Sequence, residues 1–324
     1  MIKFKRLLPV ILIAFYASTA SYAALTYEMK TIGKHANEVL GVFVNEADTQ
    51  VATCSLDETI KIWGIPNGKE ICTLKGHLGQ VNNLSYSGND KLLASASSDM
   101  TVRVWDVDKC AQNMILKGHT DQVIGVYFSQ DDNSSFIAST SFDKTVKLWD
   151  RVLGTEIKTL RGHTKPTNNV AYSYDGTQIA SCSDDKTIKI WSTDLETKAP
   201  LMTLHGHESP VLTVLYSFDS KYLISSDQTG NIKIWLVSDG SLIRTIKAHD
   251  ELIQDVSIAA DNKTIISGSL DKKVKLWDLT TGQNLYSQTI DSEIWSVDMV
   301  SDASILVLGC ADGTVRFLTR KGGK

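Results

Sequence analysis

Short apolar runs alternate with polar turns along the chain from about residue 25 onward. One unit reads VIGVYFS, the turn QDDNSS, FIASTS, the tight turn FDK, TVKLWD and a last run ending in TLRGH, over residues 123–163. Runs of this length, rich in β-branched and aromatic residues and bounded by Asp, Asn, Ser and Gly, are typical of β-strands. Each unit therefore predicts four short strands.

The third run of the unit has apolar bulk on both of its faces. In TVKLWD, Val146 and Leu148 point to one side, and Lys147 and Trp149 point to the other. A strand that is apolar on both faces must be covered on both. The pattern therefore predicts small sheets packed face to face.

The same unit recurs with a nearly constant period. Tryptophan ends the third run at Trp63, Trp105, Trp149, Trp191, Trp235 and Trp277, at spacings of 42 or 44 residues, and Leu318 takes the seventh place. A histidine, mostly in a Gly-His pair, precedes each tryptophan: His35, His77, His119, His163, His207 and His249. Periods of 40–45 residues with these two signatures indicate a β-propeller with one four-stranded blade per repeat.

These repeats resemble the WD-repeat family over residues 26–320. The segment 27–35 reads as a fourth strand without three strands before it, and the segment 314–320 reads as a third strand without a fourth after it. In the family such halves pair and close the ring, which removes the open sheet edges. The resemblance implies an all-β, seven-bladed propeller over residues 24–324, with blade 7 closed by the N-terminal strand.

The resemblance also implies a polar network in each blade. In the family, the histidine bonds the Asp of the tight turn, a Ser or Thr of the second strand and the indole N–H of the Trp. The chemistry suits burial, because Trp only donates, ionised Asp only accepts, and neutral His does one of each. The matching sets are His35, Asp57, Trp63; His77, Asp99, Trp105; His119, Asp143, Trp149; His163, Asp185, Trp191; and His249, Asp271, Trp277.

Two blades depart from this pattern. In blade 5, Thr229 stands where the Asp is expected, so His207 lacks its anion unless Asp227 substitutes. Blade 7 keeps Asp312 but has no histidine and carries Leu318 in place of Trp. In every blade the serine could lie two or four residues before the Asp, and the sequence does not choose between them.

Residues 1–23 read as an export signal. MIKFKR is basic, LLPVILIAFYA is apolar, and STASYA offers small residues for cleavage after Ala23. We expect a periplasmic or secreted protein without a membrane span after cleavage. The alternatives are an uncleaved anchor through residues 7–25 and an intracellular protein with an unusual leader.

The net charge and the cysteine spacing argue against two classes of function, polyanion binding and zinc binding. Without the leader, 30 Lys and Arg face 37 Asp and Glu, a net charge of −7, which does not favour polyanions. The five cysteines, Cys54, Cys72, Cys110, Cys182 and Cys310, show no zinc-site spacing. We interpret them as small buried side chains. An odd number cannot all pair internally, and any disulfide among them stays open.

No catalytic, metal or cofactor site is expected. A His-Asp-Ser set repeated five times is scaffold, since one active site per blade is implausible. One basic residue recurs in each third strand: Lys61, Arg103, Lys147, Lys189, Lys233, Lys275 and Arg316. This even spread around the ring does not predict a nucleic-acid face. We expect these side chains to cover apolar surface while their charges reach water.

The resemblance places a partner site on the top rim, where tight turns and Gly-His loops meet the channel mouth. The candidate partner-binding residues are Trp295, Phe142, Leu40, Ile124, Leu212, Asn82, Asn168, Gln254 and Asp184. Trp295 is the leading anchor because the His-bearing loop before it is deleted. The alternative is that these side chains pack into the channel lip.

The sequence therefore predicts an exported, non-catalytic scaffold that binds a protein or peptide and no nucleic acid. The alternative is a propeller enzyme or small-ligand binder that uses the central channel. That alternative predicts carboxylates or a metal at one channel mouth, and Asp184 is the only acid among the rim positions. The oligomeric state and the identity of the partner are left open.

Overall fold

Every regular element of the described chain is a β-strand. The computed structural model describes residues 25–131 and 134–322, so the expected leader, residues 1–23, lies outside the described residues. Twenty-eight strands form seven antiparallel sheets of four strands each. Within these residues, no helix has the length and apolar character needed to cross a bilayer. The all-β, seven-bladed prediction is confirmed.

The strands fall into four sets according to their place in the blade. The first strands are β2 (Val39–Val44), β6 (Val81–Tyr86), β10 (Val123–Phe128), β14 (Thr167–Tyr172), β18 (Val211–Tyr216), β22 (Ile253–Ile258) and β26 (Ile294–Met299). The second strands are β3 (Gln50–Ser55), β7 (Leu92–Ser97), β11 (Phe136–Ser141), β15 (Gln178–Ser183), β19 (Tyr222–Asp227), β23 (Thr264–Ser269) and β27 (Ile305–Cys310). The third strands are β4 (Ile60–Gly64), β8 (Thr101–Asp106), β12 (Thr145–Asp150), β16 (Ile188–Ser192), β20 (Asn231–Leu236), β24 (Lys273–Asp278) and β28 (Thr314–Arg320). The fourth strands are β5 (Glu70–Leu74), β9 (Ala111–Lys117), β13 (Glu156–Arg161), β17 (Met202–Leu204), β21 (Leu242–Lys247), β25 (Asn284–Thr289) and β1 (Tyr27–Lys34).

The first strands line the centre of a closed ring. Each contacts the first strand of the next blade, and β2 contacts both β6 and β26. Burial follows the place in the blade: second strands are buried almost throughout, whereas fourth strands are exposed along much of their length. Apolar clusters formed by neighbouring blades therefore supply the cores, as the two-faced apolar strands predict.

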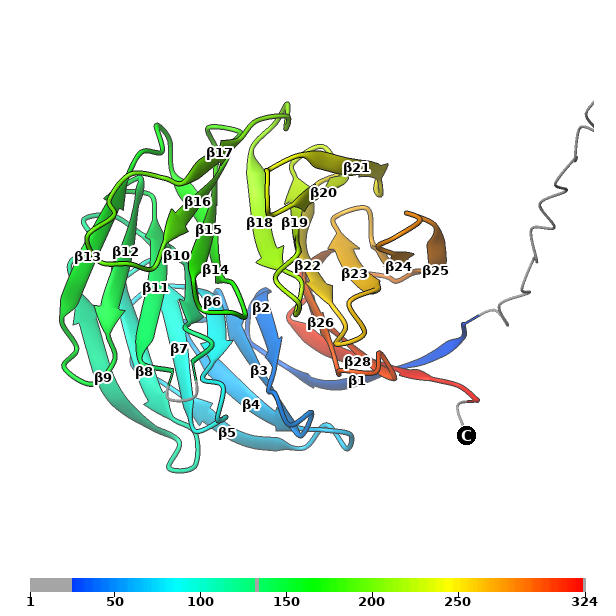
Figure 1. The fold of residues 1–324 in the computed structure, drawn as a ribbon. Coiled ribbons are helices and arrows are strands. Elements are labelled where there is room, and N and C mark those ends of the chain that lie inside the picture. The colour runs from blue at the N-terminus through cyan, green and yellow to red at the C-terminus, as the bar shows by residue number, and fades with distance from the viewer. Residues whose placement is uncertain (1–24, 132–133, 323–324) are drawn as a thin grey trace, which may run out of the picture.

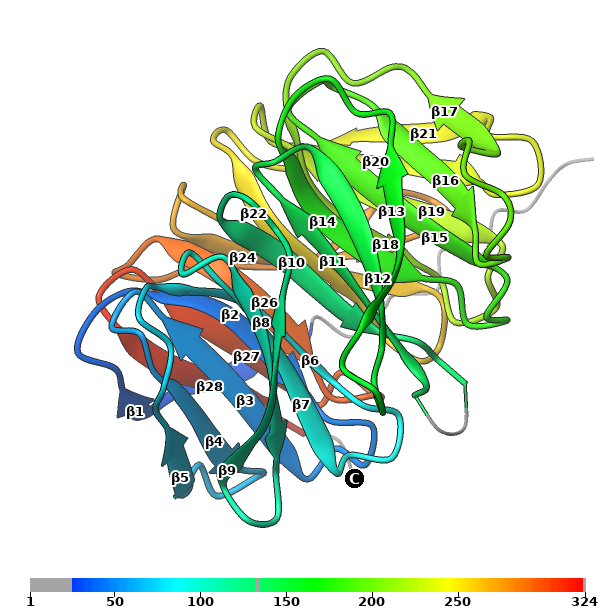
Figure 2. The ribbon, with the colours of Figure 1, turned by 90° about the vertical axis from the view of Figure 1, so that its left-hand side faces the viewer.

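The N-terminal strand closes the ring, as predicted. β1 pairs with β28 in antiparallel register from Tyr27 opposite Arg320 to Lys34 opposite Thr314. Figures 1 and 2 both show β1 beside β28, although the two strands come from opposite ends of the chain. The Tyr27 hydroxyl also donates a hydrogen bond to the Ala303 carbonyl at 2.7 Å. Blade 7 thus contains both ends of the described chain.

Small side chains in the second strands let neighbouring blades approach. Cys54 and Cys182 are completely buried at this place, as expected from its small occupants. Gly268 holds it in blade 6, where an added Cβ would come within 2.5 Å of Ile294 and Val297 of blade 7. Burial raises the thiol pKa of Cys54 and Cys182, which keeps these thiols protonated.

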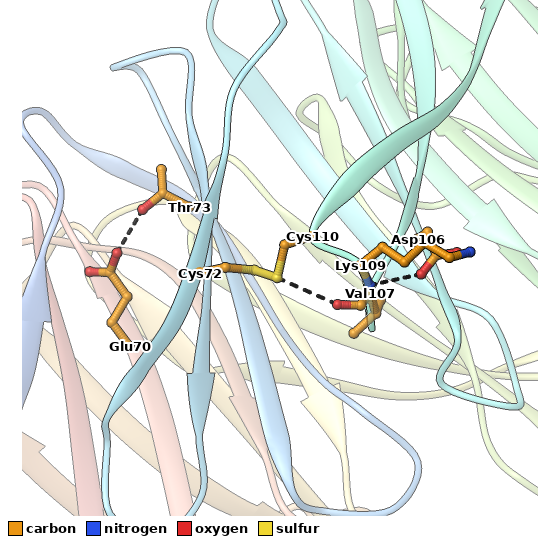
Figure 3. Close-up of a disulfide and its surroundings, with 7 residues drawn as sticks. All are labelled: Glu70, Cys72, Thr73, Asp106, Val107, Lys109 and Cys110. Carbon is orange, nitrogen blue, oxygen red and sulfur yellow. Dashed lines mark hydrogen bonds and ion pairs between the residues drawn. A yellow bond between two sulfur atoms is a disulfide. The ribbon is translucent and has the colours of Figure 1, made fainter.

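One disulfide joins two neighbouring blades at the outer edge of the ring. Cys72 on β5 of blade 1 bonds Cys110, which directly precedes β9 of blade 2, with their Cα atoms 6.3 Å apart (Figure 3). Cys54, Cys182 and Cys310 are buried free thiols, in agreement with their interpretation as small core residues. The interpretation was wrong for Cys72 and Cys110, because a repeat pattern does not show which outer strands meet.

Candidate functional site

A hydrogen-bonded chain fixes the top face of each of the first six blades. In blade 2, the Trp105 indole N–H donates to the Ser95 hydroxyl at 2.8 Å, and this hydroxyl lies 2.7 Å from Nε2 of His77. Nδ1 of His77 lies 2.8 Å from the Asp99 carboxylate. Because the indole only donates, Ser95 donates to Nε2, and the remaining imidazole proton on Nδ1 faces Asp99.

The same chain recurs around the ring, with Thr53 as the hydroxyl in blade 1. The Nδ1–carboxylate distances are 3.1 Å for His35–Asp57, 2.7 Å for His119–Asp143, 2.9 Å for His163–Asp185, 2.8 Å for His207–Asp227 and 2.9 Å for His249–Asp271. The indole N–H donates to a hydroxyl at 2.8 or 2.9 Å from Trp63, Trp149, Trp191, Trp235 and Trp277. In blade 2 the network serine is the one four residues before the Asp, whereas Ser97 accepts the backbone N–H of Asp99.

In blade 5, Asp227 substitutes for the missing turn aspartate. It ends β19, two residues before Thr229, and its carboxylate lies 2.8 Å from Nδ1 of His207. The hydroxyl and backbone N–H of Thr229 also donate to Asp227, as does the N–H of Asn231. Blade 5 therefore has a complete network.

Blade 7 replaces the histidine chain with ion pairs. Arg316 on β28 is buried, and its guanidinium donates to Asp312 at 2.6 Å and to Asp291. Its Nε donates to the Thr314 hydroxyl at 2.8 Å. The expectation that the loop before Trp295 is deleted was wrong: residues 290–293 form a loop without a histidine, one residue shorter than the loop 248–252 before β22. Asp291 lies in this loop, and its ion pair with Arg316 ties the loop to β28.

Most of the other third-strand basic residues bond to their fourth strands, whereas Lys275 donates to the Ala248 carbonyl in the loop before β22. Lys61 donates to Glu70 at 2.8 Å, and Lys147 donates to Glu156 at 2.7 Å. Lys147 and Lys233 are more than nine-tenths buried. The expectation that these charges reach water was wrong for Lys147, Lys233 and Arg316. Hydrogen-bond partners on the adjacent strand hold the two ammonium groups, and Asp291 and Asp312 hold the guanidinium.

Protonation states in the networks follow from burial and hydrogen bonding. Burial lowers the pKa of His35, His77 and His207, and lowers that of His249 to about 4. Burial raises the pKa of the partner carboxyls Asp99 and Asp227, but the hydrogen bonds that they accept outweigh this effect and hold their pKa below the ordinary value. The networks of blades 1, 2, 5 and 6 are therefore built from neutral histidine and ionised aspartate.

The predicted rim residues converge on one cavity at the top of the channel. This upper cavity has a volume of about 170 Å³. It is lined by Leu40, Asn82, Ile124, Asn168, Leu212, Gln254 and Trp295 from the seven first strands, together with Phe142 from a tight turn. Asp184 is next to it and accepts a hydrogen bond from Asn168 at 2.9 Å. The structure thus brings all nine candidates together.

Two polar rim residues bond to the neighbouring blade, whereas the apolar rim residues keep part of their surface exposed. Asn82 and Asn168 each donate a side-chain hydrogen bond to a backbone carbonyl of the next blade, at 2.7 and 2.8 Å. Phe142 is 36% exposed, and Leu40, Ile124 and Leu212 are part-buried. Trp295 is also part-buried, and its indole nitrogen has no hydrogen-bond partner among the described residues. The lip of the channel therefore covers Trp295 only partly.

Sequence reasoning missed two acids deeper in the channel. Asp255 on β22 accepts hydrogen bonds from the Ser296 hydroxyl at 2.5 Å and the Val297 N–H at 3.3 Å. Asp298 on β26 accepts from the Ser257 hydroxyl and the Val44 N–H, both at 2.7 Å. Burial raises their pKa to about 7 and about 6. The available signal was an acid inside the apolar runs IQDVSI and IWSVDM.

The fold and these networks define a seven-bladed propeller built from repeats. Six segments match the family model described as WD domain, G-beta repeat: residues 27–64, 68–106, 110–150, 154–192, 198–235 and 240–278. They cover more than half of the chain, so the protein belongs to the WD-repeat family. Propellers of this family are typical protein-interaction scaffolds and are generally non-catalytic. A search of curated proteins gives no match.

Removing the network hydroxyl of one blade tests its role. Ser95→Ala leaves the Trp105 indole N–H and Nε2 of His77 unpaired, so we expect the free energy of unfolding to fall by about 1–3 kcal/mol. Chemical denaturation measures this change. Ser238→Ala is the control, because Ser238 is exposed. Equal stability of the two variants would contradict the network's role.

The free energy of unfolding should fall as the pH is lowered from about 7 to about 5. Unfolding lets His35, His77, His207 and His249 take up protons below about pH 6.5, whereas their lowered pKa keeps them neutral in the fold. The raised pKa values of three carboxyls, Asp255, Asp298 and Glu46, act in the opposite sense, so the fall is smaller than the four histidines alone would give. Urea titrations across this range provide the measurement, and stability that rises with acid would contradict the account.

Proposed function

We propose that this protein is an exported, non-catalytic scaffold that binds a protein or peptide through the top rim of its propeller. The single observation that carries the proposal is the convergence of Trp295, Phe142, Leu40, Ile124 and Leu212 around one cavity at the channel mouth. Large apolar side chains at such a mouth suit a partner's side chain, since aromatic anchors dominate interface energetics. Membership of the WD-repeat family supports the same class of function.

Trp295 is the central anchor in this proposal. Its side chain is only part-buried, but its indole nitrogen is buried and has no hydrogen-bond partner among the described residues, so Trp295 offers a partner the apolar surface of its ring. The loop before β26, residues 290–293, carries no histidine and is one residue shorter than the loop 248–252 before β22. An extended segment that crosses blade 7 can therefore reach the ring of Trp295 and the apolar side chains opposite.

Two independent features support export. Residues 1–23 have the basic, apolar and small-residue regions of a cleaved signal. The Cys72–Cys110 disulfide fits an oxidising compartment, because cytosolic thiols are normally kept reduced. We therefore propose a periplasmic or secreted location.

The absence of catalysis is part of the proposal. The His-Asp-Ser sets have a structural role, since the serine hydroxyl already links the Trp indole to the His imidazole, as Ser95 does in blade 2. A nucleophilic serine needs a free path to its substrate, whereas Ser95 is fully buried. These sets therefore hold the top loops in place.

A peptide array tests the rim. Trp295→Ala combined with Phe142→Ala should weaken binding of selected peptides by at least about tenfold, because two aromatic anchors are removed. The matched control is Val152→Ala combined with Leu153→Ala, which truncates two exposed apolar residues between β12 and β13. Binding that survives the first pair, or that both pairs weaken equally, would count against the rim as the site.

Mass spectrometry of the protein from its expressing cells tests export. The expected mature chain begins at Ala24, and a digest without reducing agent contains the Cys72–Cys110 cross-link. A mature chain that retains Met1, with both thiols free, would refute the proposed export.

A further inference from the structure

The lower half of the channel holds a second cavity, at the opposite end from the top rim. Its volume is about 170 Å³, and it extends to the turns between the first and second strands. Glu46 and Ser301 at this end are exposed, so the lower cavity opens to solvent there. Three residues, Asn83, Asn169 and Asp255, line both this cavity and the upper cavity, but the other lining residues differ.

One side of the lower cavity is aromatic. Phe43 of blade 1 and Tyr127 of blade 3 meet edge to face with ring centroids 6.0 Å apart. Tyr174 of blade 4 and Phe218 of blade 5 follow, with ring centroids 4.5 Å apart. All four rings line the cavity and remain part-exposed. Blades 1, 3, 4 and 5 thus present an aromatic arc.

The remaining side is anionic. Asp255 of blade 6 and Asp298 of blade 7 lie on neighbouring first strands, and their hydrogen-bond donors are neutral hydroxyl and backbone N–H groups. No lysine, arginine or histidine lines the cavity, and neither acid forms an ion pair within the described part of the chain. A carboxylate held away from bulk water without a counter-charge is unfavourable. A bound cation would remove that cost.

We propose that the lower cavity binds a small organic monocation, of the alkylammonium type. The aromatic arc offers ring faces that attract a cation, and the two aspartates supply the opposite charge. The volume suits such an ion, since an apolar cavity of about 150 Å³ holds one benzene molecule. Among the described residues, no group of three His, Cys, Asp or Glu is placed to hold a metal ion. The geometry therefore favours an organic cation over a metal.

Binding depends on pH through the two acids. Below the pKa of about 6 for Asp298 and about 7 for Asp255, the carboxyls are protonated and lose their attraction for a cation. The other titratable groups that line the cavity are Glu46, Asp48, Tyr127, Tyr174 and Tyr216. Asp48 is held by the Ser301 backbone N–H at 3.0 Å, and burial raises the pKa of all three tyrosines, so they stay neutral. Affinity should therefore decrease from about pH 8 to about pH 5.

Isothermal titration calorimetry with butylammonium chloride tests the site, with butan-1-ol as the neutral probe and sodium chloride as the ionic-strength control. Asp298→Asn should lower affinity about tenfold, because the charge is lost while an acceptor for the Val44 N–H remains. Phe218→Leu should also weaken binding, and it leaves the charges intact. Asp302→Asn, which changes an exposed acid near the same face, should bind as the unaltered protein does.

A second probe, lysine with its α-amino and carboxyl groups capped, distinguishes a free amine from the lysine side chain of a peptide. Binding of butylammonium alone indicates a free amine, and binding of both probes indicates that a peptide's lysine also fits; either result supports the site. Absence of binding by both, equal binding of butan-1-ol, or affinity unchanged in both Asp298→Asn and Phe218→Leu would overturn the proposal. Stabilisation by magnesium or calcium without any response to ammonium would also overturn it. The outcome is independent of the top rim, because Trp295 and Phe142 do not line this cavity.

Discussion

The structure depends on a packing constraint: each blade is apolar on both faces and must be covered by a neighbour on each side. A linear array of such sheets would leave two uncovered faces and two open edges. The pairing of β1 with β28 removes this problem, because it completes blade 7 between blades 6 and 1. Small residues such as Cys54 and Gly268 then set how closely the blades approach.

Polar groups are arranged so that this packing leaves few of them unpaired. The inner edge of every blade presents backbone N–H groups that have no strand partner on that side. Side chains of the preceding blade accept several of these bonds: Ser85 accepts from Phe128 at 3.1 Å, Ser296 accepts from Val42 at 3.0 Å, and Asp298 accepts from Val44 at 2.7 Å. At blades 6, 7 and 1, two carboxylates take over this role, and they also make the lower channel anionic.

The two ends of the channel consequently have different chemistry. The upper end combines apolar side chains with amides that are bonded to the next blade, and it suits a protein or peptide segment. The lower end combines aromatic rings with Asp255 and Asp298, and it suits a small cation. Blade 7 contributes to both ends, through Trp295 above and Asp298 below. The blade that departs furthest from the repeat therefore contributes a distinctive side chain to each of the two cavities.

The sequence by itself determined the repeat, the number of blades, the closing strand and the members of five polar networks, because these features recur at a fixed spacing and follow from local residue types. It also indicated which residues surround the channel mouth. It left open whether Asp227 serves His207, and it did not reveal the Cys72–Cys110 pair, the Arg316 cluster or the two channel acids. Each of these contacts joins residues that are distant in the sequence or belong to different blades, and it occurs at only one place in the ring. Only the closed ring decides which of them meet, since a periodic pattern carries no information about contacts that occur once.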